Sequence, residues 1–178
     1  MTTETFRKGQ LADLPAIMEV YKSAKAHLKA QGINQWQSSY PSDADLRDDI
    51  EKGFSYVLDI DGDIAAVGSI ITPHDPDYLR IEDGSWLTDT HAEHAAFHRT
   101  AVSDKFRGQG LSKKLMQGLI TTAKELGFND MRIDTHEDNK AMQHVITSNG
   151  FDYRGIIWTK EDNDKARRFA YQLVANQD

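Results

Sequence analysis

The segment Thr100–Lys114 places the strongest constraint on what this chain can fold into. It reads as the end of an apolar strand, a basic turn with glycines at positions 108 and 110, and the start of an amphipathic helix. Glycine lets the backbone approach a ligand and point its N–H groups inward. The following helix N-terminus adds free N–H donors and a partial positive charge of about half a unit. The segment predicts a strand–turn–helix unit that can bind a diphosphate, although an ordinary structural turn can carry the same Gly-x-Gly pattern.

Length and composition indicate one globular domain spanning residues 1–178. The net charge of −7 argues against a broad nucleic-acid or anionic-membrane surface. Because the chain has no cysteine, disulfides and thiolate chemistry are excluded. The polar N-terminus lacks an apolar signal core, and the apolar run Ile64–Ile71 is too short for a membrane span. We therefore expect a cytoplasmic protein.

Apolar periodicity and capping residues predict four helices, over residues 13–30, 42 or 43 to 50, 110–126 and 139–148. The expected N-caps are Asp13 for the first helix, Ser42 or Asp43 for the second and Asn139 for the fourth. Apolar runs between turn signals predict strands over residues 5–8, 56–60, 64–71, 95–102, 131–135, 153–158 and 169–174. Segment 81–89 fits either a short strand or a turn, and the charged run Lys160–Arg168 is expected to form an exposed hairpin connection.

This order of elements predicts an α/β (α+β) domain. Residues 95–135 should form a right-handed crossover between parallel strands. The hairpins on either side should be antiparallel, which gives one mixed, mostly antiparallel sheet of six to seven strands with helices on both faces.

Two motifs resemble those of the GCN5-related N-acetyltransferases, the GNAT family. The run Lys105-Phe-Arg-Gly-Gln-Gly110 is similar to the family's pyrophosphate loop, with Lys105 in place of the usual Arg or Gln. A second segment of the family is resembled by Asn139-Lys-Ala followed by Gly150-Phe151, and the two motifs occur in the family's order. Rossmann and Walker loops require Gly and Lys spacings that this chain lacks. The resemblance implies the GNAT fold and covers nearly the whole chain.

The resemblance implies that acetyl-CoA is the cosubstrate, with no metal. A backbone N–H near Val102 is then expected to polarise the thioester oxygen, and Asn139 to approach the pantetheine arm. The residues expected to bind the cofactor are Thr100, Val102, Lys105, Arg107, Gly108, Gln109, Gly110, Leu111, Ser112 and Asn139.

The general acid is where the sequence departs from the family. Ile146 occupies the position at which the family usually has a Tyr that acts as the general acid. Either transfer proceeds without a dedicated acid, or a histidine such as His136 or His98 serves, since imidazole titrates near pH 6.5. His98 lies where family members often carry a base, and strand alternation predicts it on the same face as Thr100 and Val102. As alternatives, His98 is a hydrogen-bonded core residue and His136 a solvated loop residue.

The acceptor pocket is less defined. Trp36, Tyr40 and Glu137 are candidates to line it, although the two aromatic residues also suit packing and Glu137 suits a solvated turn. His91 and His94 are three residues apart, but the sequence offers no third ligand, so a metal site is not expected.

We therefore expect an N-acetyltransferase that moves an acetyl group from acetyl-CoA to a primary amine by direct transfer. A catalytically weak acyl-CoA-binding or sensing module is the alternative. The acceptor is a small molecule or a peptide, with no nucleic-acid or membrane partner. Dimers are common in the family, so a homodimer is one expectation.

Overall fold

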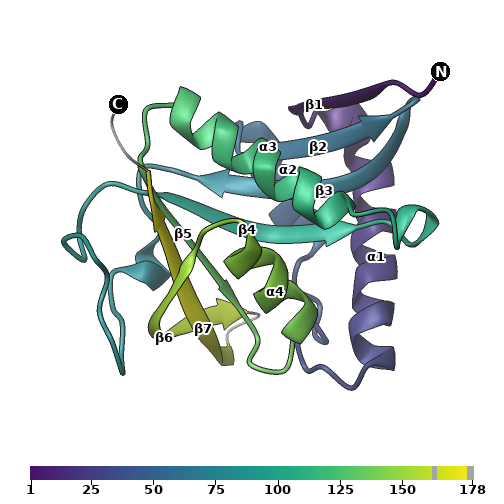
Figure 1. The fold of residues 1–178 in the computed structure, drawn as a ribbon. Coiled ribbons are helices and arrows are strands. Elements are labelled where there is room, and N and C mark those ends of the chain that lie inside the picture. The colour runs from purple at the N-terminus through teal and green to yellow at the C-terminus, as the bar shows by residue number, and fades with distance from the viewer. Residues whose placement is uncertain (162–163, 176–178) are drawn as a thin grey trace.

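The computed structural model describes residues 1–161 and 164–175, and within these ranges it forms a seven-stranded mixed sheet (Figure 1). The strands are β1 (Glu4–Lys8), β2 (Ser55–Ile60), β3 (Asp63–Ile71), β4 (Ala95–Val102), β5 (Asp130–Thr135), β6 (Asp152–Glu161) and β7 (Asp164–Val174). The α-helices are α1 (Leu14–Ala30), α2 (Asp43–Glu51), α3 (Leu111–Glu125) and α4 (Lys140–Ser148). Short 3₁₀ turns are η1 (Leu11–Asp13), η2 (Pro76–Tyr78) and η3 (Asp104–Phe106).

The strand order is β1-β2-β3-β4-β5-β7-β6, and β4–β5 is the parallel pair among antiparallel ones. Helix α3 makes the crossover between β4 and β5. Helices α3 and α4 cover one face of the sheet, while α1 and α2 cover the other (Figure 1). The predicted fold class is confirmed, because the alternation of strands and helices in the sequence already required a two-sided sheet.

Side-chain caps fix the starts of two helices as the sequence predicts. Ser42 Oγ accepts from the Asp45 N–H at 3.2 Å and begins α2. Asn139 Oδ1 accepts from the Met142 N–H at 3.2 Å and begins α4. Asp13 precedes α1 as predicted, but its carboxylate accepts from the N–H of Gln10 and from Arg7 rather than from the helix. Local hydrogen bonding therefore sets where these helices begin.

The predicted hairpin over Lys160–Arg168 is confirmed, but its turn is shorter than predicted and the run is not exposed throughout. Strands β6 and β7 extend through most of this run, with Trp158 opposite Arg167 and Thr159 opposite Ala166. Arg168 is buried, with a 3% exposed side chain. Its charge lies 3.9 Å from the Asp134 carboxylate on β5, which makes burial tolerable. The tip of this predicted connection, residues 162–163, lies outside the described residues.

The segment 81–89, which the sequence left open, is mainly irregular. It contributes a single antiparallel bridge between Glu82 and Ile156 of β6. Most of its backbone follows a loop that connects β3 to β4.

A β-bulge in β4 overturns the predicted alternation. Gly68 of β3 faces both Arg99 and Thr100, because the pairing register shifts there, and Arg99 has a left-handed backbone with φ of +51°. The extra residue reverses which face each later side chain takes. His98 therefore faces the α1–α2 side, whereas Thr100 and Val102 face the α3–α4 side.

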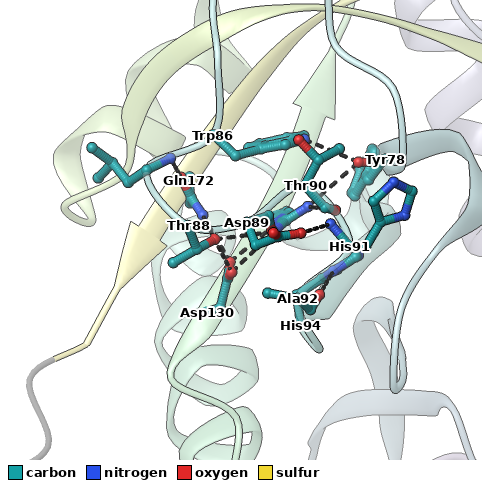
Figure 2. Close-up of polar contacts among 12 residues, drawn as sticks. Tyr78, Trp86, Thr88, Asp89, Thr90, His91, Ala92, His94, Asp130 and Gln172 are labelled. Carbon is teal, nitrogen blue, oxygen red and sulfur yellow. Dashed lines mark hydrogen bonds and ion pairs between the residues drawn. The ribbon is translucent and has the colours of Figure 1, made fainter.

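A buried arginine anchors the loop between β3 and β4. Arg132 on β5 has no exposed surface and pairs with Asp130 at 3.0 Å. Its guanidinium also donates to the carbonyls of Asp89 and Thr90, at 3.0 and 3.1 Å, and lies 4.5 Å from the Trp86 ring centroid. Figure 2 shows this group of polar contacts between the loop and the sheet. The path of the β3–β4 loop thus depends on the Arg132 guanidinium, which comes from the sheet.

We expect Arg132→Leu to destabilise the protein by about 3–5 kcal/mol, because Asp130 would remain buried without its cationic partner. Urea denaturation at neutral pH measures this loss. Arg167→Ala is the matched control, because it removes an exposed ion pair to Glu137 with a 2.7 Å contact. That change should cost about 0–1 kcal/mol, and equal losses in the two variants would contradict the anchoring role of Arg132.

Candidate functional site

The central cavity opens where β4 and β5 separate. These strands pair only between residues 95–97 and 131–133, after which they diverge. A cavity of about 170 Å³ lies between them, lined by residues 97–102 and 133–135. The end of α1, the α1–α2 segment and the first turns of α3 and α4 complete the wall. The cavity thus joins both faces of the sheet at one point.

The glycine-rich turn adjoins this cavity and leaves backbone donors open. Gly108 and Gly110 have positive φ values of +85° and +71°, and a Cβ at either position would meet nothing within 4 Å. The first backbone hydrogen bond of α3 runs from the Lys114 N–H to the Gly110 carbonyl. Among the described residues, no acceptor is found for the backbone N–H groups of residues 108–113. Such a run of free donors at a helix N-terminus fits a diphosphate.

The end of β4 presents further free donors. The Ser103 N–H donates to the Ala65 carbonyl of β3 at 2.8 Å. Because N–H directions alternate along a strand, the N–H groups of Thr100 and Val102 point away from β3, toward the gap left by β5. Both residues line the cavity. The backbone here can therefore donate to a group placed between the strands.

The side chains of the turn take different positions. Lys105 and Gln109 are exposed. Arg107 lines the cavity, but its guanidinium folds back onto Asp104 at 2.6 Å. Leu111 is buried in the core, so its side chain packs the helix while its N–H faces the turn. Ser112, one residue on, lines the cavity with a half-buried side chain.

Asn139 links the two sides of the cavity. While its Oδ1 caps α4, its Nδ2 donates to Gln35 Oε1 at 3.1 Å. Gln35 is buried in the α1–α2 segment, next to Trp36. Sequence reasoning missed Gln35, and a single polar residue in an irregular segment carries no local signal of such a contact.

His98 lies at the apex of the diverging strands, where it lines the cavity. Its Nε2 forms an ion pair with Asp75 Oδ2, and its Nδ1 lies 3.9 Å from Asp134 Oδ2. The Tyr78 ring stacks on the imidazole with centroids 5.2 Å apart, and its hydroxyl donates to Asp134 at 2.5 Å. Burial lowers the pKa of His98, but the neighbouring Asp75 and Asp134 carboxylates outweigh it and raise this pKa above its usual value.

The two carboxylates respond in opposite ways. Burial acts to raise the pKa of Asp75, but the charge of and hydrogen bond to His98, the Asp77 N–H and Arg99 together outweigh it and hold this pKa at about 2. Burial raises the pKa of Asp134 despite the opposing effects of His98, Tyr78 and Arg168. Sequence reasoning gave no role to either carboxylate or to Tyr78. Asp134 could have been found as a polar residue near the end of a buried strand, whereas Asp75 in its proline-flanked loop carried no such signal.

His136 and Glu137 lie outside the cavity lining. The Nδ1 of His136 accepts from the Asp138 N–H at 3.0 Å, and burial together with Arg168 lowers the pKa of this imidazole. Glu137 forms an exposed ion pair with Arg167. The structure therefore does not bring these two predicted residues together with His98.

Of the two aromatic residues predicted to line the acceptor pocket, Trp36 lines the cavity and Tyr40 does not. Trp36 lines the cavity and packs edge-on against Tyr21, with ring centroids 5.7 Å apart. The Tyr40 hydroxyl accepts from Arg99 at 2.6 Å, beside the ion pair between Arg99 and Asp49. Tyr40 does not line the cavity and instead supports the β4 bulge.

Ile146 on α4 is fully buried, so the position of the family's usual Tyr carries an aliphatic side chain in the core. His94 is likewise buried, with its Nε2 accepting from the Asp75 N–H. Within residues 1–161 and 164–175, no three histidine or carboxylate side chains gather in a way that could hold a metal ion. In the same ranges, every helix is too short or too polar to cross a bilayer.

Comparison with known proteins agrees with this architecture. Residues 16–151 match the model of the acetyltransferase (GNAT) family. An uncharacterized N-acetyltransferase, YesJ, of Bacillus subtilis (strain 168) is 30% identical over 130 residues, which cover 72% of this chain and 70% of that protein.

Solved structures are similar over nearly the whole chain. A GNAT-family acetyltransferase from Streptococcus agalactiae 2603 is 34% identical, with a TM-score of 0.87 over 98% of this chain and 96% of that chain. The ribosomal-protein α-N-acetyltransferase RimL in complex with coenzyme A shares the fold at 20% identity, with a TM-score of 0.67 over 99% of this chain and 96% of that chain. With its seven-stranded sheet, its glycine turn and these relatives, the chain belongs to the GNAT family of acetyl-CoA-dependent acetyltransferases.

Proposed function

We propose that this enzyme transfers the acetyl group of acetyl-CoA directly to a primary amine, within the cavity between β4 and β5. One observation carries the proposal: the glycine turn with its free N–H donors adjoins the cavity through Arg107 and Ser112, and Val102 and His98 line the same cavity. The cavity and the adjoining turn thus offer a diphosphate site, a donor for a carbonyl oxygen and a base. A small-molecule or peptide amine is the acceptor class.

The binding of acetyl-CoA follows from the distribution of donors. The amides of residues 108–113 would hold the pyrophosphate, and Asn139 would approach the pantetheine arm once its contact with Gln35 opens. Bound acetyl-CoA supplies an acetyl group activated as a thioester. Lys105, Arg107 and Gln109 border the same turn, where their side chains can add contacts to the phosphates.

An ammonium group must lose two protons to become an amide, one before it attacks the thioester and one afterwards. A lysine-like ammonium has a pKa of about 10.4, so a base has to accept its first proton before it can attack. His98 takes this proton, directly or through water, and the Val102 N–H stabilises negative charge developing on the acetyl oxygen. The second amine proton ends on the departing sulfur, which yields the free thiol. Since a thiolate is a tolerable leaving group, the hydrophobic Ile146 does not prevent this final step.

A thiol-release assay across small amines, amino acids and peptides tests the proposed transfer. We expect turnover that saturates with both acetyl-CoA and one class of primary amine, and an acetylated amine visible by mass spectrometry. Saturable coenzyme A binding without turnover on any amine would contradict the proposal and favour an acyl-CoA sensor.

Gly110→Asp should weaken coenzyme A binding at least about tenfold, because it places a carboxylate in the proposed pyrophosphate site. Isothermal titration calorimetry measures the dissociation constant. Gly127→Asp is the matched control: Gly127 also has a positive φ, of +93°, and open space around its Cβ position, but it lies at the other end of α3. Equal affinities of the two variants would remove the assignment of the turn to the pyrophosphate.

The pH dependence of kcat/KM should report the protonation of His98. Because Asp75 and Asp134 raise its pKa, activity should fall as the pH drops through a value above 6.5. His98→Gln should abolish this acidic limb and slow turnover by about 10²-fold or more. His136→Ala should leave the limb in place, because His136 does not line the cavity. A limb that survives in His98→Gln would show that another group is the base.

A further inference from the structure

The loop between β3 and β4 delivers a carboxylate to the apex of the cavity. Asp75 is 7% exposed, and its backbone N–H donates to His94 Nε2 at 3.1 Å. Its Oδ1 accepts from the Asp77 N–H at 2.8 Å, which leaves Oδ2 directed at His98. The same loop is fixed to the sheet by Arg132, which donates to the carbonyls of Asp89 and Thr90. Asp75 is therefore held by contacts that do not involve a substrate.

The two ring nitrogens of His98 have different surroundings. Nε2 has no solvent-exposed surface and faces Asp75, whereas Nδ1 lies 3.9 Å from the nearest Asp134 oxygen, too far for a hydrogen bond. A carboxylate opposite one ring nitrogen favours the proton on that nitrogen. In the neutral ring, the lone pair is then on Nδ1, the ring nitrogen on the side of Asp134, which lines the cavity together with His98.

We propose that Asp75 is the positioning residue of His98: it keeps the imidazole proton on Nε2 and leaves Nδ1 to accept a proton from the acceptor amine. This inference rests on the proposed function. An N–H bond of the ammonium breaks and an N–H bond forms at Nδ1, directly or through one water. The resulting imidazolium is stabilised by Asp75 until the proton passes to solvent.

Each element packed around His98 contributes to this balance. Asp75 comes from the β3–β4 loop, Asp134 from β5 and Arg99 from β4 itself. Both carboxylates favour the imidazolium, whereas burial and Arg99 oppose it. Asp134 also accepts from the Tyr78 hydroxyl and lies 3.9 Å from Arg168, so its charge is shared among three partners. Asp75 is thus the dominant stabilising partner of His98.

Asp75→Asn tests the assignment with little change in side-chain volume. We expect kcat to fall at least about tenfold and the acidic limb of the pH profile to move to lower pH, since a neutral amide does not stabilise the imidazolium. The KM for acetyl-CoA should stay near that of the wild type. Asp75→Glu keeps the carboxylate and should keep the limb closer to its original position.

Trp86→Phe is the control for a loosened loop. It removes the indole N–H donation to the Tyr78 carbonyl, which is 2.9 Å long, without changing any charge near His98. We expect lower thermal stability with an unshifted acidic limb. A shift as large as that of Asp75→Asn would overturn the proposal, because loop packing alone would then explain it.

A titration by NMR tests the same pairing without turnover. Long-range ¹H–¹⁵N spectra of the coenzyme A-free protein, with His98→Gln to assign the signal among seven histidines, report the tautomer and the pKa of His98. We expect the Nε2–H tautomer and a raised pKa in the wild type, and a lower pKa in Asp75→Asn. An unchanged His98 titration in Asp75→Asn would overturn the proposal. Absence of turnover on any amine, together with the expected shift, would remove the transferase proposal while retaining the Asp75–His98 pairing.

Discussion

The divergence of β4 from β5 is the constraint on which the rest of this structure depends. Parallel strands normally continue to exchange hydrogen bonds, but here pairing stops at Phe97 and Ile133. The bulge at Arg99 bends β4 away and is held by the ion pair between Arg99 and Asp49, at 2.6 Å. This separation frees backbone donors and opens a cavity through the sheet. Backbone groups unpaired within a sheet are costly, so their exposure to a cavity indicates a ligand site.

Two sets of buried charges lie beside this opening, on the face of the sheet that carries Tyr78. Arg132 and Asp130 fix the β3–β4 loop, and His98 lies between Asp75 and Asp134 at the apex. Buried ion pairs contribute little net stability, because desolvation offsets most of their attraction. They do, however, restrict geometry, since each charge is stable only opposite its partner. A loop of irregular backbone can therefore hold a side chain in a defined place beside the cavity.

Much of the fold was predictable because its signals are local. Apolar periodicity identified the helices and most strands, while Asn139 and Ser42 marked helix starts through hydrogen bonds to nearby residues. The bulge was not predictable, since a left-handed arginine has no sequence pattern. Nor was the length of β6 and β7 clear, because the charged run around Arg168 resembles a surface turn. Its burial depends on Asp134, which comes from another strand.

The sequence by itself determined the strand–turn–helix unit, since glycines at 108 and 110 permit the required backbone whatever surrounds them. It also determined the family, through two motifs in the expected order. Only the tertiary structure decided which ionisable groups meet. His98 was visible as a candidate, but its partner Asp75 arrives on a loop whose path is set by Arg132 on β5. Such pairings depend on long-range packing and buried charge, which no spacing along the chain encodes.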